Sequence, residues 1–165
     1  MVSATPTRER VLAILDTVKD PEIPVISVVE LGVVRDVECG PDGVTVVITP
    51  TYSGCPAMKA MEDDIIAALD AEGIGGARVR TVFAPAWTTD WIPDGAREKL
   101  RAWGIAPPGA AHDDPPVQLR RAGRVRCPFC GAGDTTLRSE FGSTACKATH
   151  YCNSCAQPFE EFKAI

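Results

Sequence analysis

The sequence predicts an α+β protein in two parts: a small three-stranded sheet packed with helices, followed by a shorter C-terminal module built around a metal ion. Residues 1–104 show the element order α-β-β-α-β-α, residues 105–122 are rich in proline, and residues 123–165 hold two C-x-x-C pairs. We therefore expect a folded domain over 1–104, a linker over 105–122 and a metal-binding module over 123–165.

The composition is that of a folded protein with no membrane segment. Of the 165 residues, 45% are apolar, which is enough for a core, but no run of 18 apolar residues occurs. The N-terminus lacks the basic and apolar regions of a secretory signal, so we expect a cytoplasmic protein. The net charge of −5 divides into −8 over residues 1–119 and +3 over residues 120–165. A weakly basic tail on an acidic body predicts no nucleic-acid partner.

The first half of the leading domain is expected to be a helix followed by a β-hairpin. The helix should begin at Thr5 or Thr7, either of which can cap it. It should end at Asp20-Pro21, because proline disfavours helical geometry in the residue before it. Two strands, Val33 to Cys39 and Val44 to Thr49, should then pair across a tight turn.

The second half of that domain is expected to add two helices and one strand. A helix should run from Pro56 to about Glu72, where Gly73 closes it. A third strand is expected over residues 79–83, because apolar and polar residues alternate there. The last helix should run from Asp94 to Trp103 and end at Gly104.

The C-terminal module carries two metal knuckles, one formed by Cys127 and Cys130 and the other by Cys152 and Cys155. A two-residue gap allows both sulfurs of a knuckle to face one ion, and two knuckles supply four thiolates for a tetrahedral centre. With strands expected at 135–141 and 148–151, this is the layout of a zinc ribbon. We interpret the metal as structural Zn2+. Iron is the alternative, because four thiolates suit both metals, and free core cysteines are the non-metal alternative.

Cys55 is the other cysteine with a candidate role. With Pro56 at the first helical position, Cys55 would be the N-cap, where the helix dipole favours a thiolate that can bind metal or act as a nucleophile. Asp20 and Glu22 lie in a proline-stiffened loop, and one of these carboxylates could complete a metal-transfer site with Cys55. The alternatives are a half-buried cysteine without a role, a helix stop at Asp20 and a solvated carboxylate at Glu22.

Other residues also have both a functional and a structural interpretation. Cys146 and His150 lie near the second knuckle and are either alternate ligands or ordinary strand and loop residues. The tryptophans form either a partner surface or core packing; they are Trp87, Trp91 and Trp103. The sequence shows no Ser/His/Asp arrangement and no phosphate-binding G-x-x-x-x-G-K-[ST] loop. We therefore expect no independent enzymatic activity.

Longer stretches of the sequence resemble a known family. DPEIPVISVVELGVV (20–34) and TPTYSGCP (49–56) resemble the SufT-like domain of iron–sulfur assembly factors. APAWTTDWIPDGAREKLRAWGIAPP (84–108) and the tail from CPFCG to FEEFKAI add a resemblance to the PaaD family of the ring-1,2-phenylacetyl-CoA epoxidase system. The resemblance covers residues 7–165.

The resemblance implies an accessory, non-catalytic subunit in aerobic phenylacetate degradation that acts in maturation of iron or iron–sulfur centres. Its implied partners are the di-iron oxygenase and the flavin/iron–sulfur reductase of that system. Cys55 matches the family's reactive cysteine, Asp20 and Glu22 match its acidic motif, and the four knuckle cysteines match its zinc ribbon. A transient iron or iron–sulfur cluster is implied at Cys55, and a cluster shared between two copies would require a homodimer.

Two other functions are compatible with the same residues. A rubredoxin-like electron carrier would hold iron in the four-cysteine site and would be red until dithionite bleached it. A purely structural subunit of the oxygenase complex would co-purify stably with that complex and would be indifferent to the loss of Cys55.

Overall fold

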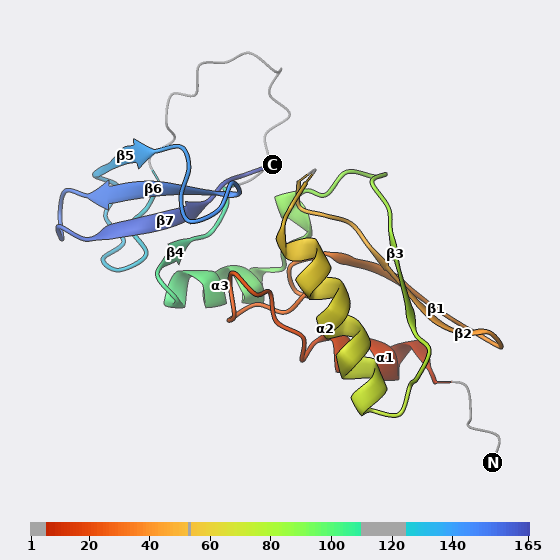
Figure 1. Cartoon of the computed structure of the whole chain (residues 1–165). Helices are drawn as coiled ribbons and strands as arrows, with labels where there is room; N and C mark the ends of the chain where they lie inside the picture. Colours follow the sequence, from red (N-terminus) through yellow and green to blue (C-terminus); the bar gives the residue numbers. More distant parts are fainter. Residues whose placement is uncertain (1–5, 53, 110–124) are drawn as a thin grey trace. The chain divides into compact units, whose positions relative to one another are not determined.

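The computed structural model of the chain describes residues 6–52, 54–109 and 125–165 (Figure 1). Thr5 and most of the expected linker, residues 110–122, lie outside the described residues. Contacts divide the chain into two compact units, Met1–Trp87 and Thr88–Ile165. Each unit has its own sheet.

The first unit combines two helices with a three-stranded sheet. Its elements are α1 (Arg8–Leu15), β1 (Val34–Gly40), β2 (Gly43–Ile48), α2 (Ala57–Ala71) and β3 (Arg78–Thr81). β1 and β2 form an antiparallel hairpin, whereas β2 pairs in parallel with β3 because α2 carries the chain across between them. The strand order is β1-β2-β3, which confirms the predicted three-stranded α+β arrangement.

The core of this unit lies between the helices and the sheet. Both helices bury one apolar stripe, as residues three or four positions apart share a helix face. The fully buried side chains include Val11 and Leu15 from α1, Met61, Ile65 and Leu69 from α2, and Val46 and Ile48 from β2. No helix in the described part of the chain is long and apolar enough to cross a membrane.

α1 begins at an expected cap but ends earlier than expected. The Thr7 hydroxyl accepts a hydrogen bond from the Arg10 N–H at 3.3 Å, which caps the helix. The helix stops at Leu15 rather than at Asp20. The chain turns there instead, because Thr17 N–H donates to the Ile14 carbonyl at 3.0 Å.

The second unit is a four-stranded sheet with one α-helix. Its elements are η1 (Thr89–Trp91), α3 (Asp94–Ala102), β4 (Ile105–Ala106), β5 (Thr135–Ser139), β6 (Lys147–Cys152) and β7 (Pro158–Phe162). The strand order is β4-β7-β6-β5. β5 and β6 are the two predicted ribbon strands, whereas β7 was not predicted. β4 pairs in parallel with β7, so the first two residues of the expected linker complete the ribbon sheet.

The division of the chain differs from the boundary expected at residue 104. Residues from Thr88 onward make their contacts within the second unit. One reason is β4, which occupies the expected start of the linker. Another is that the Thr88 hydroxyl and the Thr89 N–H donate to the carbonyl of Ile165 at 2.8 Å and 3.1 Å, respectively. η1 and α3 therefore belong with the ribbon.

Candidate metal centre and the Cys55 loop

The four knuckle cysteines gather into one cluster. Their sulfur atoms all lie within 4.8 Å of one another. The Sγ–Sγ distance is 3.7 Å between Cys127 and Cys155 and 3.6 Å between Cys130 and Cys152. A tetrahedral ion with metal–sulfur bonds of about 2.3 Å requires sulfurs about 3.8 Å apart, whereas a disulfide requires about 2.05 Å. The donor set therefore fits a four-thiolate metal ion and leaves no position open for a substrate.

The two knuckles have the same pattern of backbone hydrogen bonds. In the first, Gly131 N–H donates to the Cys127 carbonyl and Cys127 N–H donates to the Ala132 carbonyl, both at 2.9 Å. In the second, Ala156 N–H donates to the Cys152 carbonyl at 3.0 Å and Cys152 N–H donates to the Gln157 carbonyl at 2.9 Å. The residue four positions after each leading cysteine has a positive φ, 75° at Gly131 and 58° at Ala156.

Ala156 carries a backbone cost that glycine would remove, since a Cβ is disfavoured in the left-handed region. We expect Ala156→Gly to tighten zinc binding about five-fold, which corresponds to about 1 kcal/mol. The mirror substitution, Gly131→Ala, should weaken binding by a similar factor, and no atom lies near enough to clash with the added Cβ. Competition with a chelator measures both constants. Equal zinc affinities for the two variants would contradict the inference that the positive φ at these two positions affects metal binding.

Apolar packing surrounds the sulfur cluster on its inner side. Cys127 and Cys152 are buried together with Ala106 of β4 and Phe159 of β7. Cys130 is exposed and Cys155 is half-buried. Because this buried cluster is small and two of its members are metal ligands, metal binding should supply much of the free energy that folds the ribbon.

Before a metal binds, the thiols differ in acidity. The pKa of the Cys152 thiol is lowered to about 7, chiefly by a hydrogen bond from the backbone N–H of Cys155. Burial, followed by the neighbouring sulfurs, raises the pKa of the Cys155 thiol to about 12. A metal ion at neutral pH must therefore displace a proton from Cys155, so the affinity for metal falls as the pH falls.

The FGSTACKA segment (141–148) contains Lys147, which forms an ion pair with Glu160. Lys147 Nζ lies 3.2 Å from a carboxylate oxygen of Glu160, and the Lys147 side chain is 4% exposed. Ser143 N–H donates to the same carboxylate at 2.6 Å. A Cβ at Gly142 would lie 2.7 Å from Glu160 Oε1 and 3.1 Å from the Lys147 Cβ, so the glycine leaves the space that this carboxylate occupies. The small residues of the segment thus serve the packing of this pair.

The acidity of Glu160 follows from that environment. Burial alone would raise its pKa, but hydrogen bonds from Ser143 and the charge of Lys147 outweigh burial and hold the pKa of the Glu160 carboxyl below its usual value. A lowered pKa in the folded state stabilises the fold at neutral pH. This contribution is lost as the pH falls through the lowered pKa.

Cys146 and His150 lie outside the sulfur cluster. Cys146 Sγ lies 3.0 Å from the Thr144 hydroxyl, and the cysteine is buried. The His150 ring stacks on Phe159 with centroids 5.4 Å apart, and its Nε2 lies 2.9 Å from a carboxylate oxygen of Glu161. Both side chains therefore have packing roles in the second unit.

Cys55 does not sit at the cap of α2. The helix begins at Ala57 with Pro56 as its N-cap, so Cys55 lies one residue earlier than expected for a cap. The reason is a tighter first turn, in which Met58 N–H donates to the Cys55 carbonyl at 3.3 Å, three residues back rather than four. Cys55 is 9% exposed and therefore lies at the edge of the buried core.

Asp20 organises the loop that carries Glu22. Its Oδ1 accepts hydrogen bonds from Glu22 N–H at 2.8 Å and Ile23 N–H at 2.7 Å, and the side chain is buried. Among residues 6–52, 54–109 and 125–165, the four cysteines are the only set of three or more metal-ligand side chains close enough to share an ion. The transfer site formed by Cys55, Asp20 and Glu22 therefore stays a prediction.

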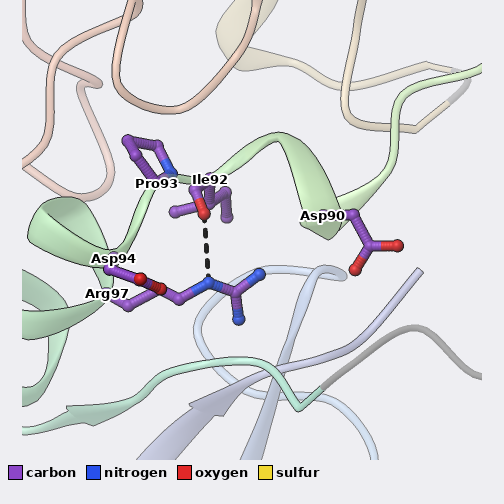
Figure 2. A pocket seen from close by; sticks show the side chains of 5 residues that line it. All are labelled: Asp90, Ile92, Pro93, Asp94 and Arg97. Atoms are coloured by element: carbon purple, nitrogen blue, oxygen red, sulfur yellow. Dashed lines mark hydrogen bonds between the residues drawn. The ribbon is translucent and has the colours of Figure 1, made fainter.

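An open hollow in the second unit has a structural explanation. It is lined by Asp90, Ile92, Pro93, Asp94 and Arg97 (Figure 2). Arg97 donates from Nε to the Ile92 carbonyl at 3.0 Å and from its terminal nitrogens to the carbonyls of Thr89 and Pro108 at 2.8 Å and 2.6 Å. These bonds hold η1 and the segment after β4 against α3, which gives the Arg97 guanidinium a structural role.

Sequence reasoning missed two contributors to the metal centre, Ala106 and Phe159. Phe159 lies in β7, where PFEEF places two glutamates side by side between its phenylalanines and so shows no period-two alternation of a strand. Ala106 gives no strand signal either, because a two-residue strand beside prolines is too short to show a period.

The two units match two different family models. Residues 8–82 match the model of iron–sulfur cluster assembly proteins, and residues 111–163 match the model of the PaaD zinc beta ribbon domain. A solved structure of a conserved hypothetical protein from Thermotoga maritima aligns with a TM-score of 0.51 at 33% identity, covering 60% of this chain and 98% of that one. The chain is thus an iron–sulfur assembly domain joined to a zinc ribbon domain.

Curated relatives identify the family more closely. An Escherichia coli protein provisionally named as the D-type subunit of 1,2-phenylacetyl-CoA epoxidase is 45% identical over 162 residues, which is 98% of this chain and 96% of that protein. The chain therefore belongs to the PaaD family, as its sequence motifs predicted. An iron–sulfur protein maturation auxiliary factor of Porphyromonas gingivalis is 36% identical over 96 residues, covering 57% of this chain and 90% of that protein.

Proposed function

We propose that this chain is an accessory, non-catalytic subunit that helps to install iron or an iron–sulfur cluster in the phenylacetyl-CoA epoxidase system. One observation carries the proposal: a domain of the iron–sulfur assembly family, residues 8–82, lies within a chain that matches an epoxidase subunit over almost its whole length. Maturation of an epoxidase component is the function that accounts for both the assembly-family domain and the match to an epoxidase subunit.

Cys55 would act as the transient metal ligand. Transfer requires a weak, open site, and one thiolate with an assisting carboxylate suits this better than a closed cage of four thiolates. Asp20 Oδ1 accepts two backbone hydrogen bonds and so positions the loop that carries Glu22; Asp20 or Glu22 would be the carboxylate that assists. The Zn2+ held by the four cysteines would be structural.

The test is the metal content of the epoxidase components. The oxygenase and the reductase are produced with this chain, with its Cys55→Ala form, with a Cys39→Ala form and without the chain, and their iron and sulfide are measured. We expect iron or cluster content to fall with Cys55→Ala as far as it falls without the chain. Cys39→Ala, which removes a half-buried cysteine of the same unit, should leave it unchanged. Full metal loading with Cys55→Ala would refute the transfer role.

Electron transfer through the four-cysteine site is the second candidate, because sulfur separations of 3.6–3.7 Å also suit iron. Metal analysis of the purified chain distinguishes electron transfer from a role in metal-centre maturation. A red protein with one iron that dithionite bleaches favours electron transfer, and a colourless protein with one zinc favours the structural ribbon. Unchanged client metal content together with stable co-purification would instead favour a structural subunit of the oxygenase complex.

A further inference from the structure

Two large aromatic side chains of the second unit are exposed, and Phe129 lies against the residue that follows Trp103. Trp103 is 57% exposed and Phe129 is 56% exposed. The Phe129 ring lies directly against the backbone of Gly104, the residue that follows Trp103, since a Cβ there would come within 2.9 Å of the ring. Gly104 also has a φ of +89°, so glycine is required for both reasons. Exposed tryptophan and phenylalanine are the residue types that anchor protein interfaces.

The backbone holds both aromatic residues in place. Trp103 N–H donates to the Lys99 and Leu100 carbonyls at 3.0 Å and 3.1 Å, which closes α3. Phe129 lies within the first knuckle, between two metal ligands. An anchor that is already ordered loses little conformational entropy when a partner binds.

The metal centre connects the two aromatic residues. Ala106 follows Trp103 by three residues and is buried with Cys127 and Cys152. β4 is also paired with β7, which reaches the same cluster through Phe159. Because the metal would fix Cys127 and Cys152 together, it would also fix the end of α3 against the knuckle that carries Phe129.

The rim of this surface is basic. Lys99 is exposed in the last turn of α3, four residues before Trp103 and therefore on the same helix face. Arg126 is exposed beside the knuckle, where its Nη1 donates to the Gly131 carbonyl at 3.3 Å. An aromatic centre with a basic rim complements an acidic segment that carries apolar side chains.

We propose that Trp103 and Phe129, framed by Lys99 and Arg126, form a docking surface for an acidic segment of a client protein, and that the metal of the four-cysteine site assembles this surface. The choice of an epoxidase component as the client rests on the proposed function. Docking through the second unit would leave Cys55, in the first, for metal transfer.

Binding is tested by calorimetry between the zinc-loaded full chain and the purified di-iron oxygenase or reductase. We expect Trp103→Ala combined with Phe129→Ala to weaken binding about 30-fold or more, the size typical of interface hot spots. Phe141→Ala is the matched control, because it removes an equally exposed aromatic residue from the same unit. Lys99→Glu should weaken binding, Arg138→Glu should not, and the wild-type affinity should fall as salt is raised.

Metal dependence is tested by amide hydrogen exchange over residues 97–106, with and without zinc. We expect their protection and the binding to be lost together when zinc is removed. Retained protection and binding without zinc would overturn the role of the metal. Undiminished binding by the double aromatic variant, or a wild-type chain that binds neither component, would overturn the docking surface. The iron-content experiment with Cys55→Ala tests the proposed function separately, because it changes none of the four residues of the docking surface.

Discussion

Replacement of Cys152 by serine is expected to unfold the whole second unit, including α3 and β4. The cysteine is fully buried with Ala106, Cys127 and Phe159, so its loss removes a metal ligand and opens the core at the same point. Structural zinc contributes apparent binding free energies of about 10–16 kcal/mol in zinc-finger peptides, which the small apolar cluster around the sulfurs cannot replace. Bound zinc should fall from about one ion per chain to nearly none.

The measurement is zinc content combined with amide exchange or two-dimensional NMR. Cys146→Ser is the matched control, because Cys146 is also a buried cysteine of this unit but lies outside the sulfur cluster. It should retain zinc and the native spectrum. A Cys152→Ser protein whose α3 amides stay protected would show that the helix folds without the metal and would contradict our description of this unit.

Replacement of Asp20 by alanine is expected to destabilise the first unit by about 2–4 kcal/mol. The carboxylate accepts two short hydrogen bonds from backbone N–H groups, and Ile23, which donates one of them, is almost completely buried. Removal of the acceptor leaves those donors without their partner in a site that water reaches poorly, which costs about 1–3 kcal/mol for each buried group.

Denaturant unfolding monitored by circular dichroism gives this free energy. Asp20→Asn keeps an acceptor oxygen and should lose much less stability. Glu22→Ala removes the neighbouring carboxylate without disturbing its N–H, so stability should change little. If Asp20→Ala were as stable as the wild type, Asp20 would not be the residue that holds the loop, and a direct part in metal transfer would become the better explanation for it.

The sequence predicted those features that depend on local spacing. Two C-x-x-C pairs define the four ligands, and the apolar stripe of α2 follows from its helical period. Features that depend on contacts far apart in the chain were missed. Ile105 and Ala106 stand beside prolines and looked like linker, but a pairing with β7 makes them a strand. The Cys55 cap was misplaced by one residue because the first turn of α2 is tighter than a regular α-helical turn.

Asp20 illustrates a different limit. Its position before proline suggested either a helix stop or a metal-transfer residue, and both interpretations concern what the side chain does for its immediate neighbours or for a metal. The structure shows a carboxylate that closes a turn and so holds the loop that carries Glu22. Sequence alone does not distinguish these roles, because all of them favour an acidic residue at the start of a proline-containing loop.

The strand β4 also has a consequence for folding during synthesis. The first unit ends at Trp87, so its sequence is complete once that stretch has left the ribosome. The second unit must wait, because β4 finds its partner only when β7 emerges and the Thr88 hydroxyl binds a carbonyl 77 positions later. The nascent chain therefore carries α3 and the first knuckle before β7 is available, and during that interval the ribbon sheet is incomplete.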